Sequence, residues 1–361
     1  MGQFRGDLIR ALVTAGHRVT AMAGPAPPEQ VDRIRALGAD FRPFPVQRNR
    51  ISPAADLRTL LALRRAFSTL VPDVVLAYTA KAVIWSGLAL RHTRDPRFVA
   101  LINGLGFTFQ GEGAVRKSLT ALTSALYRGS LRRAAAVVFQ NPDNLDVFVS
   151  RGIVERATCR VVDGSGINLN HYAEASLPDG PPRFVMTSRL LREKGLREFA
   201  AAARIVRAQR PEATFELFGR EERSLDAVPL EEVRGWDREG IVRYRGTVAD
   251  VRPFLEASHV CVLPSYHEGL PRSILEAMGV GRPILTTDVP GCRETVVPGS
   301  NGFLVPKGDT QALAERMIWF VDHRDRWTAM GHASRRIAEA RFDVRRVNAD
   351  MLAVLGLEAH G

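Results

Sequence analysis

The chain has 361 residues, of which 45% are hydrophobic and 25% charged, a composition typical of a folded globular protein that excludes disordered and collagen-like chains. The formal net charge is +11, and most of it lies in residues 1–180, which carry 23 Lys and Arg against 14 Asp and Glu. A basic half-molecule predicts an anionic partner, such as nucleic acid, a membrane surface or a phosphorylated substrate. The alternative is a general abundance of arginine, which supplies 46 of the 50 cations.

Cysteine usage and hydropathy predict a cytoplasmic protein. Cys159, Cys261 and Cys292 are far apart and form no CxxC motif, which argues against a disulfide framework or a structural zinc site. The first residues do not resemble a signal peptide, and no run of 18 uncharged apolar residues occurs, so we expect neither a leader nor a spanning helix.

Short apolar runs alternate with helix-length segments along the chain, which predicts an α/β fold with doubly wound parallel sheets. The predicted strands are His17–Ala23, Asp73–Tyr78, Phe98–Ile102, Ala135–Phe139, Cys159–Val162, Phe184–Ser188, Thr214–Phe218, Val242–Arg245, Val260–Leu263, Pro283–Thr286 and Gly302–Val305. The predicted helices include Leu57–Thr69, Val115–Arg133, Leu196–Ala208 and Thr310–Asp322.

The alternation pauses once, at Asn168–Pro182, which is rich in Pro, Gly, Asn and Asp and reads as an interdomain linker. We therefore expect two Rossmann-like domains that face each other across a cleft, at residues 1–167 and 183–335. A final helical region at 336–361 is expected to return to the first domain. Ligands of such sheets bind at the carboxyl ends of the strands.

The segment 265–281, SYHEGLPRSILEAMGVG, carries two glutamates separated by seven residues, Glu268 and Glu276. Pro271 suits the start of a helix that runs to about Met278. Amides at this helix start (Leu270, Arg272, Ser273) would favour an anion, and each glutamate could grip a sugar diol. The alternative is an ordinary loop glutamate and an ordinary solvated helix glutamate.

The segment SRLLREKG places Arg189 and Lys194 after the predicted strand Phe184–Ser188, where both could neutralise phosphate. The alternative is surface charge. The chain has no P-loop, no GxGxxG after its first strand and no DxD pair, so a diphosphate would have to be neutralised by cations and backbone amides.

These residues bring out a resemblance. SRLLREKG, LFG, RYRGTVADV, the segment PSYHEGLPRSILEAMGVGRPILTTDVPGCRE and NGFLVP, in that order, resemble the donor half of glycosyltransferase family 4, the retaining GT-B enzymes. FRGDLIRAL, YTAKAVIW, LINGLGFTF and VFQNPDN resemble the branch of N-acetylgalactosaminyl- and galacturonosyltransferases that extends polyprenyl-diphosphate-linked sugars in bacterial surface glycan assembly.

The resemblance implies that the C-terminal domain binds a nucleotide sugar, expected to be UDP-linked, and that the N-terminal domain binds the acceptor. Arg189 and Lys194 would neutralise the donor diphosphate, Glu276 would hold the ribose, and Glu268 would contact the sugar and the oxocarbenium-like transition state. The implied donor contacts also include Gly269, Leu270, Pro271, Arg272, Ser273, Gly219, Arg220, Arg245 and Gly246. The implied acceptor contacts are Gly2, Arg5 and Gly6 of an amino-terminal glycine loop, with Lys81, Asn103, Gly104 and Gly106.

The expected reaction is retaining transfer of a HexNAc or uronic acid without a metal or another cofactor. The expected partners are the donor, a lipid-diphosphate-linked acceptor and an anionic membrane surface at the cytoplasmic face of the inner membrane, and no nucleic acid. Two alternatives stay open: a nucleotide-sugar hydrolase or epimerase of the same fold, and a basic nucleic-acid-binding protein, which lacks a motif here.

Two features of the first half add expectations. Members of the resembled family carry a strand before the FRGDL segment. If this chain lacks that strand, we expect a sheet edge and an apolar hole in its place. Val115–Arg133 reads as a basic amphipathic helix, with an apolar stripe of Leu119, Leu122 and Leu126, that could lie on an anionic membrane or simply face the core. Its basic residues are Arg116, Lys117, Arg128, Arg132 and Arg133.

Overall fold

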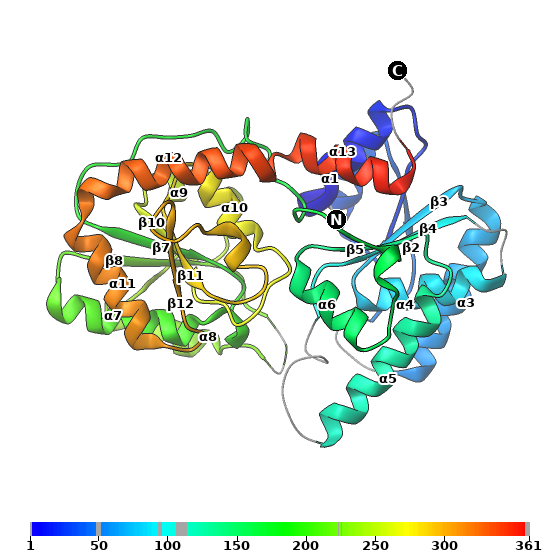
Figure 1. The fold of residues 1–361 in the computed structure, drawn as a ribbon, viewed down its shortest axis with the longest axis horizontal. Coiled ribbons are helices and arrows are strands. Elements are labelled where there is room, and N and C mark those ends of the chain that lie inside the picture. Colours follow the sequence, from blue (N-terminus) through cyan, green and yellow to red (C-terminus); the bar gives the residue numbers. More distant parts are fainter. Residues whose placement is uncertain are drawn as a thin grey trace. The chain divides into compact units, whose positions relative to one another are not determined.

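The computed structural model describes residues 2–47, 52–92, 96–105, 114–222, 224 and 226–357. The chain divides into two compact units, one formed by Met1–Ser165 with Arg345–Gly361 and the other by Gly166–Val344. The expected domain limits therefore shift: the first crossing lies at 165/166 rather than at a linker 168–182, and the chain returns at Arg345 rather than at 336. Figure 1 follows this path by colour, from the blue amino terminus to the red carboxyl terminus.

Unit 1 is built on parallel strands with helices between them. Its helices are α1 (Gly2–Thr14), α2 (Pro28–Arg35), α3 (Pro53–Leu70), α4 (Ala80–Ala89), α5 (Ala114–Leu131), α6 (Pro142–Ser150) and α13 (Val344–Leu355). Its strands are β1 (Thr20–Ala23), β2 (Asp40–Pro43), β3 (Val74–Tyr78), β4 (Arg97–Ile102), β5 (Ala136–Phe139) and β6 (Cys159–Val161). Asn141 caps α6 by accepting the Asn144 amide at 2.8 Å.

The strands of unit 1 form two separate ladders, β1-β2 and β3-β4-β5-β6, and no ladder among the described residues joins β1 to β3. Strands β1 and β3, which lie on either side of this division, are only partly covered. Most of their residues are half-buried, whereas β5 is fully buried. The strand that relatives carry before the FRGDL segment stays a prediction. Sequence reasoning missed β2, because its DFRP sequence has no apolar alternation and ends in proline, as edge strands allow.

Unit 2 contains one continuous parallel sheet in the order β12-β11-β10-β7-β8-β9. Its strands are β7 (Arg183–Thr187), β8 (Thr214–Phe218), β9 (Arg243–Tyr244), β10 (Val260–Leu263), β11 (Ile284–Thr287) and β12 (Gly302–Val305). Its helices are α7 (Leu196–Gln209), α8 (Leu230–Arg238), α9 (Arg252–Glu256), α10 (Arg272–Gly279), α11 (Thr310–Asp322) and α12 (Trp327–Ile337), with the 3-10 turn η4 (Arg192–Lys194) before α7. Together with unit 1, all eleven predicted strands are present, and α11 has its predicted limits.

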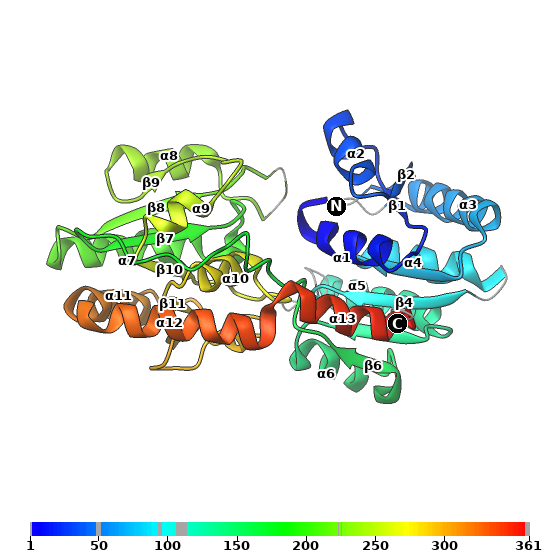
Figure 2. The same cartoon turned by 90° about the horizontal axis from the view of Figure 1, so that it is seen from above.

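The central strands of the unit 2 sheet lie inside its hydrophobic core. Strands β10 and β11 are buried along their whole length, as expected of a parallel sheet covered on both faces. Helices α7 and α11 lie side by side on one face of the sheet in Figures 1 and 2. Asp309 caps α11 by accepting the Ala312 amide at 2.9 Å. The loops that connect strands and helices therefore lie at the two ends of the parallel strands.

The segment expected as a linker is part of the unit 2 core. Leu169 and Tyr172 are buried in it, and the fully buried guanidinium of Arg282 donates to the carbonyls of Ala175 and Ser176 at 2.7 and 3.1 Å. Burial lowers the pKa of Arg282 to about 10, so it stays charged at neutral pH. This segment has no periodic apolar face. Hydrogen bonds from a buried guanidinium to its backbone carbonyls hold it in place, and composition does not reveal such bonds.

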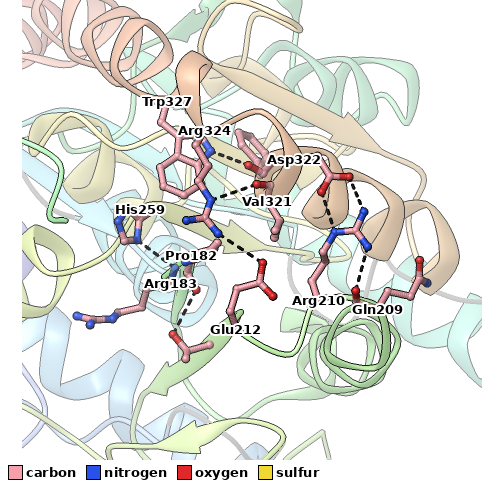
Figure 3. A network of polar contacts seen from close by, with 12 residues as sticks. Pro182, Arg183, Gln209, Arg210, Glu212, His259, Val321, Asp322, Arg324 and Trp327 are labelled. Atoms are coloured by element: carbon pink, nitrogen blue, oxygen red, sulfur yellow. Dashed lines mark hydrogen bonds and ion pairs between the residues drawn. The ribbon is translucent and has the colours of Figure 1, made fainter. Parts of the chain in front are cut away.

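A polar network fixes the amino end of β7 (Figure 3). His259 accepts the Arg183 amide on Nδ1 at 3.0 Å, so its Nε2 carries the hydrogen and donates to the Pro178 carbonyl at 2.8 Å. Burial lowers the pKa of His259, which keeps the ring neutral. Arg210 forms a bidentate pair with Asp322 at 2.8 and 2.9 Å. This network fixes the amino end of β7. The candidate site lies at the opposite, carboxyl end of the strand.

Candidate functional site

The carboxyl ends of β7 and β10 bring two predicted residues together. Lys194 lies in η4 after β7, Glu268 lies in the loop after β10, and the two strands are hydrogen-bonded neighbours. The Lys194 Nζ is 2.7 Å from Glu268 Oε1, and the Ser265 hydroxyl donates to the same oxygen at 2.7 Å. We call these three residues the Lys194 cluster. It joins a cation and a carboxylate that are 74 residues apart in the sequence.

The Lys194 cluster is tightly packed. Ser265 is fully buried, and its hydroxyl also lies 3.1 Å from the carbonyl of Glu193. Behind Glu268, a Cβ on Gly291 would lie 2.5 Å from the Glu268 carbonyl oxygen, and the φ of Gly291 is +86°, so this position requires glycine. Burial alone would lower the pKa of Lys194, but the Glu268 and Glu193 carboxylates raise it. Lys194 is therefore a permanent cation at a protected position.

Arg189, the second predicted cation, belongs to a more exposed neighbouring group. Its Nη1 lies 3.6 Å from Glu222 Oε1, and Arg220 Nη2 approaches the same oxygen at 2.8 Å. Arg189 is close enough to Lys194 to lower the pKa of that ammonium slightly, so both cations act on the same region. An incoming anion would compete with Glu222 for Arg189.

Four of the implied donor contacts lie at the carboxyl ends of β8 and β9: Gly219, Arg220, Arg245 and Gly246. The Gly219 amide donates to the Gly246 carbonyl at 2.9 Å, which joins the two strand ends. Arg245 Nη2 is 2.7 Å from Glu216 Oε1, so its guanidinium is held by a carboxylate of β8. The structure thus groups Gly219, Gly246, Arg220 and Arg245 around neighbouring strand ends.

Helix α10 carries Glu276, and its start follows the predicted pattern with Pro271 as N-cap. The Ile274 and Leu275 amides donate to the Pro271 carbonyl, so Arg272 and Ser273 form the first turn, where the helix dipole favours an anion. Within α10, Arg272 Nε donates to Glu276 Oε1 at 3.0 Å. Burial raises the pKa of Glu276, and Arg272 and Tyr172 oppose that rise.

In unit 1, three acceptor-side predictions are corrected and a fourth falls outside the described residues. Gly2, Arg5 and Gly6 lie in helix α1 rather than in a glycine loop, because the chain is already helical at Gly2. This helix buries Leu8 and Ile9, which favours a continuous helix over a loop. Gly106 lies outside the described residues.

The other acceptor-side residues gather near the carboxyl ends of β3 and β4. The buried Arg5 has its guanidinium 5.9 Å from the ring centroid of Tyr78, the last residue of β3. Lys81, near the start of α4, pairs with Asp56 of α3 at 2.8 Å. Asn103 and Gly104 directly follow β4, the neighbour of β3. These residues therefore share one edge of the sheet.

Sequence reasoning missed several partners of these residues, among them Ser265, Glu222, Glu216 and Asp56. Ser265 lies inside the quoted SYHEG segment, three residues before Glu268, and that spacing was the available signal. Glu222 lies two residues after Arg220, but no spacing connects it to Arg189. Glu216 and Asp56 come from other elements, and no spacing connects them to Arg245 and Lys81.

Within the described residues, no group of three or more His, Cys, Asp or Glu is arranged to hold a metal ion. No helix in the described part of the chain combines the length and the apolar character needed to cross a bilayer.

The fold is that of the GT-B glycosyltransferases. Anabaena Alr3699/HepE, solved in complex with UDP-glucose, matches 99% of this chain and 96% of its own with a TM-score of 0.79 at 20% identity. The sucrose-phosphate synthase of Thermosynechococcus elongatus matches 94% of this chain and 98% of its own with a TM-score of 0.75 at 19% identity. At these identities the likeness concerns the fold.

Family models match both halves of the chain. Residues 1–163 match the glycosyl transferase 4-like domain, and residues 181–323 match the glycosyl transferases group 1. The chain therefore belongs to the group 1 glycosyltransferases of family 4 and is a hexosyltransferase-type enzyme.

Two curated relatives extend along most of the chain. The N,N'-diacetylbacillosaminyl-diphospho-undecaprenol alpha-1,3-N-acetylgalactosaminyltransferase of Campylobacter jejuni is 26% identical over 332 residues, 88% of this chain and 86% of the relative. The UDP-Gal:alpha-D-GlcNAc-diphosphoundecaprenol alpha-1,3-galactosyltransferase of Escherichia coli is 23% identical over 287 residues, 76% of this chain and 73% of the relative.

Proposed function

We propose that the enzyme moves a HexNAc or uronic acid from a UDP-sugar to a polyprenyl-diphosphate-linked glycan, with retention of configuration. The observation that carries this proposal is the Lys194 cluster, a buried cation fixed against a carboxylate at the carboxyl ends of β7 and β10 in the group 1 domain. The names of the two long relatives support a lipid-diphosphate acceptor.

In this proposal, unit 2 binds the donor. Lys194 and Arg189 face the diphosphate, the first turn of α10 offers its amides to phosphate or sugar, and Glu276 accepts hydrogen bonds from the ribose. Glu268 contacts the transferred sugar. Ser265 and Lys194 fix its Oε1, so the carboxylate keeps one orientation while positive charge develops at the sugar ring.

The reaction breaks the bond between the anomeric carbon and the phosphate oxygen, and the electron pair leaves with UDP. The acceptor hydroxyl attacks the anomeric carbon from the face that UDP vacates, and its proton passes to the leaving phosphate oxygen. The new glycosidic bond therefore has the configuration of the donor. Stabilising the departing diphosphate is the main electrostatic task, and Lys194 is charged throughout because its pKa is raised.

We propose that this stabilisation needs no divalent ion, because Lys194, Arg189 and the α10 amides together offer positive charge and donors to the diphosphate. Addition of a chelator tests this directly. Activity that disappears in EDTA and returns with magnesium contradicts it.

On the acceptor side, we propose that α5 lies on the anionic membrane surface that carries the lipid-linked acceptor, at the cytoplasmic face. Lys117 is exposed at its start, Arg132 and Arg133 are exposed just after its end, and Leu122 is 56% exposed between them. Leu126 packs against the unit 1 core, so the expected apolar stripe is divided between core and surface. An exposed leucine flanked by cations suits an anionic interface.

Flotation with vesicles that contain anionic lipid tests this surface. Leu122→Ser should weaken binding, whereas Leu57→Ser, which replaces a similarly exposed leucine of α3, should not. Equal binding of both variants and the wild type contradicts an α5 contact.

The proposed function is tested by a donor screen. The full chain is incubated with a panel of nucleotide sugars and a lipid-diphosphate-linked sugar acceptor, and released nucleotide and extended lipid are measured. Acceptor-dependent UDP release is expected. Nucleotide release without acceptor would indicate a hydrolase, and no turnover together with salt-sensitive DNA binding would favour a nucleic-acid-binding protein.

A further inference from the structure

Helix α10 is enclosed on most sides. Five of its eight residues are buried: Ile274, Leu275, Ala277, Met278 and Gly279. The partly accessible residues are Arg272, Ser273 and Glu276. Glu276 lies four residues after Arg272 and three after Ser273, and residues at these spacings share one face of a helix. A ligand therefore meets the side chains of α10 along this single polar stripe.

The stripe contains an ion pair. Arg272 Nε donates to Glu276 Oε1 at 3.0 Å, and the two side chains are 19% and 15% exposed. A carboxylate enclosed to this degree is costly without a partner. The pair is thus a shielded contact, unlike the solvated ion pairs of a protein surface, which contribute little.

Helix stability does not explain this arginine. Arg272 lies in the first turn of α10, directly after the N-cap Pro271, where the helix dipole disfavours a cation. The order of the pair is also the weaker one, because an acidic residue four positions before a basic one stabilises a helix better than the reverse. Natural proteins break such local rules at functional sites. The arginine is better explained by its effect on Glu276.

An arginine is suited to fixing a carboxylate. The terminal torsion of a glutamate is soft, so its carboxylate plane is poorly defined without a directional partner. The guanidinium is planar and rigid, and its donors point in fixed directions. An ionised carboxylate has about four lone-pair sites, so one bond from Arg272 Nε leaves acceptor sites for a ligand diol.

We propose that Arg272 is a positioning residue that fixes the Glu276 carboxylate for the two ribose hydroxyls of the donor nucleotide. It thereby contributes to the selection of ribonucleotides over deoxyribonucleotides. This inference rests on the proposed function, in which Glu276 accepts hydrogen bonds from the ribose. A site built to bond a hydroxyl rejects the analogue that lacks it, because its polar groups are left unpaired.

Calorimetric titration of the full chain with UDP, 2'-deoxy-UDP and 3'-deoxy-UDP tests the inference. The wild type should prefer UDP over both analogues. Arg272→Met keeps an unbranched stem and removes the donor, so it should weaken UDP binding roughly three- to tenfold, the effect of about one net hydrogen bond, and change the analogues less. The ratio of UDP affinity to analogue affinity should therefore shrink.

A second variant and a control complete the test. Arg272→Lys keeps the positive charge beside Glu276 but loses the planar donor group, so its ratio should lie between those of Arg272→Met and the wild type. Arg238→Met removes an arginine of α8 that is 64% exposed and pairs with Glu231 at 2.7 Å, and it should leave the ratio unchanged.

A double variant separates positioning from direct contact. Glu276→Gln removes the carboxylate that Arg272 is proposed to position, so adding Arg272→Met to it should not lower the ratio further. A further fall would mean that Arg272 itself contacts the ribose, and it would overturn the positioning role.

A ratio in both Arg272 variants equal to that of the wild type also overturns the positioning role and leaves the proposed function standing. An equal loss of affinity for all three ligands would be such a result, and it would place Arg272 at the diphosphate. A wild type that binds no UDP overturns both the inference and the proposed function.

Discussion

The two units differ in how completely their sheets are built. Unit 2 has one continuous ladder of six strands over a single large core, whereas unit 1 has a two-stranded and a four-stranded ladder over several smaller clusters. The lysines of the two units also differ in burial. The Lys194 side chain of unit 2 is 11% exposed and pairs with Glu268 of another loop, whereas the Lys81 side chain of unit 1 is 20% exposed and pairs with Asp56 of a neighbouring helix.

The continuous sheet of unit 2 fixes the proposed donor site in the absence of a ligand. Every partner of the Lys194 cluster comes from a loop anchored at the carboxyl end of a buried strand. A preorganised charge costs no reorganisation when the leaving group departs. We therefore expect substitutions in unit 2 to act on chemistry and nucleotide binding, and those in unit 1 to act on the acceptor.

The largest effect is expected for Lys194→Ala. Removing a buried cation that is proposed to face the leaving diphosphate should lower kcat roughly a hundred- to a thousandfold, comparable to the loss of an oxyanion-hole donor. Lys307→Ala, which removes an exposed lysine of the same unit, is the matched control and should retain wild-type turnover. Steady-state UDP release measures both, and near-normal kcat in Lys194→Ala would contradict the donor-site assignment.

Glu276→Gln should give the next largest effect, on nucleotide binding. The loss of charge-assisted hydrogen bonds to the ribose should weaken UDP binding about tenfold to a hundredfold. Titration calorimetry measures this change. Unchanged affinity would place the ribose elsewhere.

The same residue predicts a pH dependence. Burial raises the pKa of Glu276, so its carboxylate takes up a proton at a higher pH than an exposed glutamate does, and UDP binding should weaken as the pH falls through that raised value. The folded state then binds the proton more tightly than the unfolded state does. Protonated Glu276 therefore stabilises the fold at a pH below the ordinary pKa of a glutamate, and this stabilisation is lost as the pH rises through the raised pKa of the folded state. In Glu276→Gln, the acid limb of the binding profile should be absent.

A smaller and different effect is expected in unit 1. Lys81→Ala removes the partner of Asp56 and a cation near the carboxyl end of β3, so it should raise the KM for the lipid acceptor several-fold. UDP affinity should not change. A variant that loses UDP affinity but keeps its acceptor KM would reverse the assignment of the two units.

The smallest effect is expected for EDTA, which should leave the initial rate unchanged. The cations of the donor side, rather than a divalent ion, are proposed to neutralise the diphosphate. Initial rates with and without chelator, followed by magnesium addition, measure this.

The sequence predicted much of the fold because buried parallel strands are unbroken aliphatic runs, as in β5 and β10. It missed β2, whose polar residues lie at an edge, and it read 168–182 as a linker because buried Leu169 and Tyr172 are isolated among polar residues. Lys194 and Glu268 were predictable because each follows a recognisable strand. The position of Tyr172 beside α10 was not predictable, since it depends on the hydrogen bond from Arg335 and on glycine at position 279, which has no side chain.

In the proposed mechanism, unit 2 holds a preformed site that stabilises a departing nucleoside diphosphate with Lys194. The most direct measurement compares single-turnover sugar transfer from a UDP-sugar to a lipid-diphosphate acceptor by the wild type and by Lys194→Ala, both saturated with donor. The rate of the variant should be lower by roughly a hundredfold or more, with its melting transition still cooperative. Equal single-turnover rates would contradict it.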